Sequence, residues 1–118
     1  MRFPMHIDSI SRARHFVRSV LPELPDETVR TAELLTSELA TNAIVHGHTA
    51  FDIEVTTSGP TVRVAVTDQC EQLPVLLSPD PSDVHGRGLL ILERLASRWG
   101  TAGDGPGKTV WFDLVAPP

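Results

Sequence analysis

The chain has 118 residues, which suits a single domain spanning 1–118 with one hydrophobic core. Its 10 basic and 15 acidic residues give a net charge of -5, which argues against direct nucleic-acid binding, because such binding relies on neutralising phosphates. The single cysteine, Cys70, excludes an intrachain disulfide. The first residues lack the apolar core of a signal peptide, and no apolar run approaches the ~18 residues of a membrane span. We therefore expect a cytoplasmic protein that does not contact a membrane.

Two amphipathic helices are predicted in the first part of the chain. Over 9–21 the apolar residues recur every three or four positions, the spacing that gives a helix one buried stripe. A second helix is predicted after Pro25, with Asp26 as its N-cap, and its apolar stripe continues to the segment 46–48. We expect Gly47 to end this helix in the left-handed conformation.

Alternating apolar and polar residues predict a β-hairpin and a final strand. The hairpin strands are expected over 51–57 and 61–67, with a short connection at 58–60, and the final strand over 109–115. Because the side chains alternate between faces, one face of this sheet should be buried and the other should meet solvent.

A long segment without periodicity and a third helix separate the hairpin from the final strand. Residues 69–85 contain three prolines, and a loop of this length inside a compact domain is either a functional lid or a disordered segment. Helical spacing of apolar residues follows over 89–99, with Gly100 expected to close that helix. The element order predicts an α+β fold of two layers, with the helices on one face of an antiparallel or mixed sheet.

Glu38 and Asn42 are one helical turn apart in the second predicted helix. Their side chains should lie about 6 Å apart on one helix face, so both can reach one ligand. Mg²⁺ prefers oxygen ligands and takes only one or two from protein when phosphates and water supply the rest, a role that suits the Asn42 carbonyl oxygen. Glu38 then suits a general base that orients the group attacking a terminal phosphate. A solvated helix face is the alternative interpretation of this pair.

Asp68 and two glycines add groups that suit a nucleotide. Asp68 follows a predicted strand, where its carboxylate could accept a hydrogen bond from the amino group of adenine. Guanine presents an oxygen at the corresponding position. At Gly86 and Gly88 the absent side chains would let phosphate approach backbone N–H groups at a helix N-terminus. A turn aspartate and an ordinary helix start are the alternatives.

Taken in order, four segments resemble the nucleotide-binding boxes of the GHKL ATPase superfamily, and more closely those of the single-domain anti-sigma-factor serine kinases. The segment LLTSELATNAIVH at 34–46 is similar to the family's N box, and VAVTD at 64–68 to the strand that enters its first glycine box. HGRGL at 85–89 is similar to the second glycine box, and GKTVWF at 107–112 to the closing strand. The similarity covers about 3–114, nearly the whole chain.

The resemblance implies a Bergerat ATP-binding fold that holds Mg-ATP beneath a lid, here residues 69–85. By position, Glu38 would be the catalytic base, Asn42 the magnesium ligand and Asp68 the reader of adenine. Thr109 would place a hydroxyl beside the adenine. The implied cofactor-binding set is Asn42, Asp68, Gly86, Arg87, Gly88, Leu89 and Thr109.

The resemblance also implies protein partners. In the anti-sigma kinases, phosphate passes to a serine of a small antagonist protein, and the kinase alternately holds that antagonist and a sigma factor. A homodimer is implied by the same resemblance. One departure is the segment 68–72, DQCEQ, which has no glycine where the family usually has one after the aspartate. This departure favours an alternative function, a non-catalytic ATP-binding module that switches between partners.

Two other motifs resemble sites of a different kind, a P-loop and a metal site. Residues 102–109, AGDGPGKT, loosely match a P-loop, but a P-loop requires a helix after its Lys-Thr pair, and a strand is predicted here. His46 and His48 flank a glycine with no nearby cysteine or matching carboxylate, so a helix end is favoured over a metal site. Neither motif displaces the predicted Mg-ATP site.

Overall fold

The computed structural model describes residues 1–69, 84–103 and 107–116, with the backbone alone for 84–89. Within these residues the strands form one sheet in the order β1-β2-β3-β5-β4, and each neighbouring pair is antiparallel. The strands are β1 (Arg2–Phe3), β2 (Phe51–Ser58), β3 (Thr61–Asp68), β4 (Arg98–Ala102) and β5 (Lys108–Val115). The helices are α1 (Asp8–Val20), α2 (Asp26–Thr41), η1 (Asn42–His46) and α3 (Val84–Leu95), where η1 is a π-helix that continues α2.

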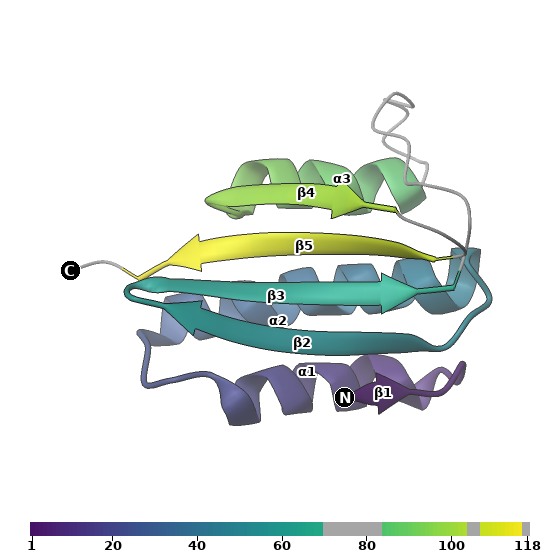
Figure 1. Ribbon diagram of the computed structural model, residues 1–118, viewed down its shortest axis with the longest axis horizontal. Helices are drawn as coiled ribbons and strands as arrows, with labels where there is room; N and C mark the ends of the chain where they lie inside the picture. The colour runs from purple at the N-terminus through teal and green to yellow at the C-terminus, as the bar shows by residue number, and fades with distance from the viewer. Residues whose placement is uncertain (70–83, 104–106, 117–118) are drawn as a thin grey trace.

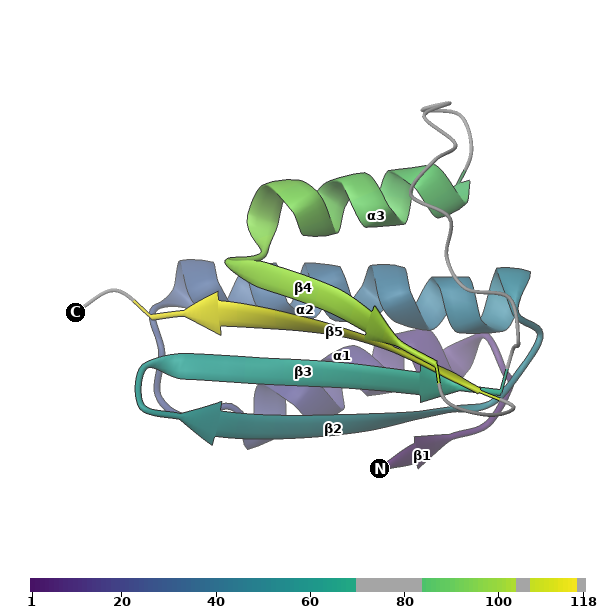
Figure 2. The ribbon, with the colours of Figure 1, turned by 45° about the horizontal axis from the view of Figure 1, so that its top comes forward.

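The helices lie together on one face of the sheet, and the other face is open (Figures 1 and 2). The predicted two-layer α+β architecture is therefore confirmed. The sheet of the described residues is antiparallel throughout, and not mixed. It also contains two edge strands that the apolar patterns did not predict, β1 and β4.

The hydrophobic core lies between the helices and the inner face of the sheet. Ile53, Val64 and Phe112 project inward from β2, β3 and β5 and are at most 1% exposed. Leu35 of α2 and Val17 of α1 meet them from the helical side and are fully buried. Burial of each such side chain stabilises the fold by about 1.5–3 kcal/mol. This core fixes α2 against the centre of the sheet.

The predicted helix over 89–99 is wrong at its carboxyl end. α3 ends at Leu95, and Trp99 and Gly100 belong to β4, where they pair with Phe112 and Trp111 of β5. Trp99 is partly buried against the core, which a strand achieves as well as a helix does. Gly100 is needed because a Cβ at this position would lie 2.7 Å from the Trp111 indole. The glycine therefore makes room for an indole and does not end a helix.

The ends of α2 also differ from the expectation. Asp26 is the first residue of the helix, and Pro25 takes the N-cap position. At the other end Gly47 is right-handed, with a φ of -83°, and its N–H donates to Asn42 O at 2.9 Å. The left-handed residue is His48, with a φ of 53°. The wider π-turn of η1 adds a residue to the helix end, which moves the left-handed position to His48.

The open face of the sheet carries an ordered cluster of polar and aromatic side chains. Arg63 donates two hydrogen bonds to Asp113, from Nε to Oδ1 at 2.7 Å and from NH2 to Oδ2 at 2.9 Å. The Arg63 guanidinium carbon also lies 4.0 Å from the ring centroid of Trp111. The hydrogen bond from Arg63 lowers the pKa of the Asp113 carboxyl below its ordinary value of 3.8.

This lowered pKa predicts an acid-sensitive contribution of Asp113 to folding. The stabilisation is fully present above the unfolded pKa and is lost as pH falls through the lower folded pKa. The free energy of unfolding, measured by denaturant titration, should therefore fall as the pH is lowered through the ordinary carboxyl pKa of 3.8 and below it, and less steeply in Asp113→Asn. Asp52→Asn, which removes an exposed partner of Arg2, is the control and should keep the wild-type slope. An unchanged slope in Asp113→Asn would contradict the assignment.

Candidate functional site

Four element ends lie together at one end of the molecule. β3 ends there and β5 begins there, with the carboxyl end of α2 and the amino end of α3 behind them (Figures 1 and 2). The strand register places Asp68, the last residue of β3, between Phe51 of β2 and Lys108 of β5. The fold thus gathers segments that are far apart in the sequence and that include the predicted site residues.

Asn42 is a buried residue at the start of η1 and is 9% exposed. Its side-chain oxygen Oδ1 has no hydrogen-bond partner within the part of the chain that the structure describes. A buried oxygen without a partner costs about 1–3 kcal/mol, so its retention favours a bound ligand. π-Helical turns such as η1 are frequent at functional sites.

Glu38 precedes Asn42 by one turn of helix and is partly buried. The backbone oxygen of Glu38 accepts a hydrogen bond from the Asn42 N–H, so the helix is continuous between the two residues. Residues at this spacing share one helix face. The carboxylate of Glu38 and the Asn42 amide oxygen, which has no partner among the described residues, therefore belong to a helix face that one ligand could contact.

Asp68 and Lys108 form a buried ion pair on the inner face of the sheet. They are directly opposite in the β3–β5 register, and Lys108 Nζ lies 3.5 Å from Asp68 Oδ2. The side chains are 6% exposed for Asp68 and 8% for Lys108. An isolated buried charge is strongly unfavourable, so each group lowers the cost of burying the other. The pair therefore lies where β3 ends and β5 begins, on the face of the sheet that the helices cover.

Gly107 lets β5 begin against the backbone of Asp68. A Cβ at Gly107 would collide with the Asp68 carbonyl oxygen, which is backbone and cannot rotate away. Glycine is the residue that permits such a close approach. The contact holds the first residue of β5 against the last residue of β3, which is where the ion pair sits.

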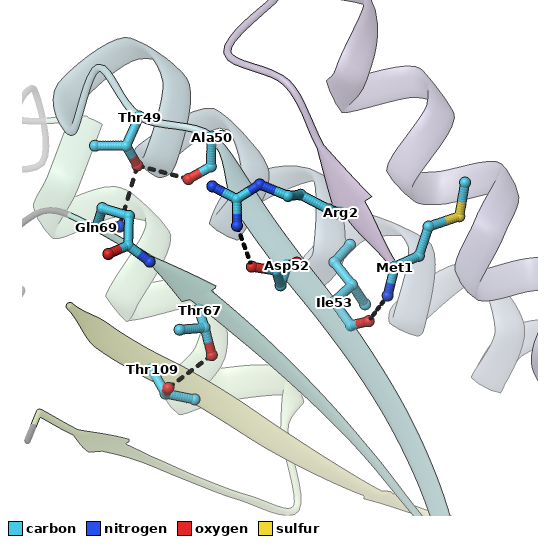
Figure 3. A network of polar contacts seen from close by, with 9 residues as sticks. All are labelled: Met1, Arg2, Thr49, Ala50, Asp52, Ile53, Thr67, Gln69 and Thr109. Carbon is cyan, nitrogen blue, oxygen red and sulfur yellow. Dashed lines mark hydrogen bonds and ion pairs between the residues drawn. The ribbon is translucent and has the colours of Figure 1, made fainter.

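The side chain of Thr109 lies on the opposite face of the sheet from that of Asp68. Its Oγ1 lies 2.7 Å from Thr67 Oγ1, and the two threonines are a cross-strand pair on the open face of the sheet (Figure 3). Lys108, one residue earlier, has its side chain on the inner face with Asp68, because successive strand residues point to opposite faces. The sequence contains a signal for this orientation. Lys108 lies two and four residues before the inward-facing Val110 and Phe112, and alternate residues of a strand share one face.

The Gly86–Leu89 segment lies within α3, which starts at Val84, earlier than the expected helix start. Gly86, Arg87, Gly88 and Leu89 therefore occupy its first turns, at the end where backbone N–H groups and the helix dipole favour an anion. The side chains of these four residues lie outside the described residues.

The predicted lid over 69–85 is only partly covered by the structure. Residues 70–83 lie outside the described residues, and Val84 and His85 belong to α3 and not to a loop. Gln69 is described, and its N–H donates a long hydrogen bond of 3.4 Å to Thr49 Oγ1 (Figure 3). This contact joins the residue after Asp68 to the segment that follows η1.

The residues present fit a magnesium nucleotide. Asn42 Oδ1 is a hard oxygen donor without a partner among the described residues, the kind of ligand that Mg²⁺ takes from protein. Asp68 supplies an acceptor for an exocyclic amino group, and the amino end of α3 supplies N–H groups for phosphate. The P-loop interpretation fails because β5 begins at Lys108, where a helix would be required.

Comparisons with known proteins agree with this fold. The chain matches two solved structures at similar levels: the blue-light activated histidine kinase of Erythrobacter litoralis EL346, and the histidine kinase domain of that protein. The TM-scores are 0.66 and 0.65, with 21% and 20% sequence identity. The matches cover 97% of this chain but 42% and 62% of the two solved chains. At this identity the likeness shows the fold alone. No curated protein sequence matches the chain at a significant level.

The fold and the site define a GHKL-type ATP-binding domain. The model of the family described as histidine kinase-like ATPase domain matches residues 3–114, so the chain belongs to that family. An ATP-binding regulatory role follows from this membership. Among the described residues, no helix combines the length and the apolar character needed to cross a membrane.

Proposed function

We propose that the protein is an ATP-dependent protein serine kinase that phosphorylates a small antagonist protein in the cytoplasm and thereby controls a sigma factor. The proposal rests on the resemblance of its four boxes to the anti-sigma-factor kinases. The observation that carries it is the Glu38–Asn42 pair, a partly buried carboxylate one turn before a buried amide oxygen that has no partner among the described residues.

The site residues divide the chemistry between them. Asn42 Oδ1 would hold magnesium, which neutralises charge on the phosphates when bound. Glu38 would accept the proton of the attacking serine hydroxyl, which strengthens the nucleophile as the bond to the terminal phosphorus forms and the bond from that phosphorus to the leaving ADP breaks. Asp68 would hold the adenine, and the amino end of α3 would hold the phosphates. Together these contacts would align donor and acceptor groups for in-line transfer.

A groove between α1 and α2 supports a protein partner. It has a volume of about 360 Å³, and its lining includes Arg14, Arg18, Arg30 and Glu33 together with Leu34, which is 43% exposed. Arg18 donates to Glu33 at 3.2 Å, so three arginines face one glutamate in this lining. In a chain of net charge -5, three arginines around an exposed leucine favour an acidic, partly apolar segment of another protein. We assign this groove to the antagonist or the sigma factor, and on the same resemblance we propose a homodimer.

A non-catalytic ATP-binding switch is the second candidate function. The glycine-free segment 68–72 favours it, because phosphoryl transfer requires close and adaptable contact between the backbone and the nucleotide. In this function the bound nucleotide would determine which partner is held, and Glu38 would have no chemical role.

Phosphoserine formation separates the two functions. The purified chain should be incubated with magnesium and ATP labelled at the terminal phosphate, together with each candidate antagonist protein from the organism that encodes it. Label on a serine of one antagonist is the expected result for the kinase. ATP binding with no transfer to any antagonist would refute the kinase and leave the switch. No binding of ATP would refute both.

A further inference from the structure

The open face of the sheet is a broad surface that no described helix covers, because the helices all lie on the other face (Figures 1 and 2). The strand register arranges the side chains of the open face in rows that run across β2, β3, β5 and β4. The middle row is Glu54, Ala65, Trp111 and Gly100. The Trp111 indole is partly exposed at the centre of this face. Tryptophan and arginine are enriched in protein interfaces, so a face that carries both is typical of a docking surface.

The charges on this face are divided between its two sides. On the β2 side, Glu54 is exposed and makes no hydrogen bond or ion pair within the described residues. On the β4 side, Arg98 is exposed and lies opposite Asp113, whose carboxylate already accepts two hydrogen bonds from Arg63. The β2 side therefore has an unpaired negative charge, and the β4 side has one positive charge more than its carboxylate can balance.

A second copy of the chain is complementary to this face in charge and in size. Two sheets that pack face to face keep their strands within about 30° of parallel. A two-fold axis along the strands, between β3 and β5, sets β2 of one copy over β4 of the other and β3 over β5. Glu54 then faces Gly100 of the second copy, two residues from Arg98. Trp111 faces Ala65 of the second copy, so a bulky side chain meets a small one. The symmetry repeats each of these contacts.

We propose that the open face of the sheet is the interface of a symmetric dimer, in which Glu54 of one copy pairs with Arg98 of the other and Trp111 packs over Ala65. The inference deepens the homodimer of the proposed function, on which it rests, and is independent of ATP binding and phosphoryl transfer. Asp68 and Asn42 are buried on the helical side of the sheet. The dimer therefore leaves the nucleotide site accessible in both copies.

Sedimentation equilibrium of the purified chain, with and without a substitution at the centre of the face, tests this interface. The wild-type chain should sediment with twice the mass of one chain at micromolar concentration. Ala65→Arg sets a long charged side chain where Trp111 of the second copy packs, so it should weaken the dimer by about 100-fold or more. Calorimetry with ATP shows whether the variant is folded. A monomeric wild-type chain at high micromolar concentration would overturn the proposal, and so would a dimer that tolerates Ala65→Arg.

An exchange of charges tests the predicted pairing of the two sides. Glu54→Arg and Arg98→Glu each set like charges opposite one another twice in a dimer, so each should weaken it about 10- to 100-fold. The double variant restores opposite charges and should recover most of the dimer affinity. Glu27→Arg makes the same change of charge at an exposed position of α2 and is the matched control, which should dimerise like the wild type.

The result for the double variant decides between pairing and a general effect of charge. Failure of the double variant to dimerise better than either single variant would overturn the pairing of Glu54 with Arg98. A dimer that neither single variant weakens would overturn the interface and leave the homodimer to another surface. Because ATP binding and phosphoserine formation are measured separately, failure of this interface would not affect the kinase proposal.

Discussion

Glu38→Gln is expected to slow phosphoryl transfer about 100- to 10,000-fold and to leave ATP affinity nearly unchanged. Glutamine has the size of glutamate but no basic carboxylate, so the attacking hydroxyl keeps its proton. The buried Asn42 and Asp68, which we propose to contact the nucleotide, are unchanged in this variant. The initial rate of phosphoserine formation on the antagonist and the Kd for ATP by calorimetry together measure this effect.

Glu27→Gln is the matched control for this prediction. Glu27 is exposed and lies on the same helix, in the first turn of α2. The Glu27→Gln variant should transfer phosphate at the wild-type rate. Transfer at the wild-type rate by Glu38→Gln would refute the general-base role. Loss of ATP binding in Glu38→Gln would instead assign Glu38 to holding the nucleotide.

Asp68→Asn is expected to weaken ATP binding by about 10- to 100-fold, because it removes an ionised acceptor worth roughly 1.5–3 kcal/mol. The discrimination between ATP and GTP should fall as well, since the asparagine amide can donate to the oxygen of guanine. Competition titrations with the two nucleotides measure both effects. Unchanged ATP affinity would refute the adenine assignment of Asp68.

The loss of folding stability has to be separated from the loss of binding in this variant. Asp68→Asn removes the carboxylate that lies 3.5 Å from the buried Lys108 ammonium, and breaking a buried pair in this way typically costs about 3–5 kcal/mol. The double variant Asp68→Asn with Lys108→Met removes both charges and should recover much of that stability without recovering ATP affinity. Recovery of affinity in the double variant would show that Asp68 acts through Lys108 alone.

The sequence predicts those parts of the site that depend on local periodicity. The helical spacing that buries Leu35 and Leu39 also determines which face carries Glu38 and Asn42, and the alternation in 61–67 places Asp68 at a strand end. These features follow from interactions between residues that are close in sequence. Spacing alone places Glu38, Asn42 and Asp68 but assigns them no chemical role, and the roles proposed for them come from the resemblance.

Other parts of the site depend on contacts between distant segments. The pairing of Asp68 with Lys108 is fixed by the β3–β5 register, and the resemblance led to Thr109 one position away. A shift of one residue in a strand exchanges the two faces, so a small error in register moves the hydroxyl to the open face. The apolar pattern predicts a helix as far as Trp99, and only the pairing of Trp99 with Phe112 shows that the first residues of β4 belong to a strand.

Calorimetric titration of the purified chain with ATP, with and without magnesium, tests the nucleotide site most directly. Saturable binding near one nucleotide per chain, tightened by magnesium, is the expected result, because the proposed site offers Asn42 Oδ1 to the metal and the Asp68 carboxylate to the base. No binding at millimolar ATP would contradict the site itself and leave a family fold that acts through protein contacts alone.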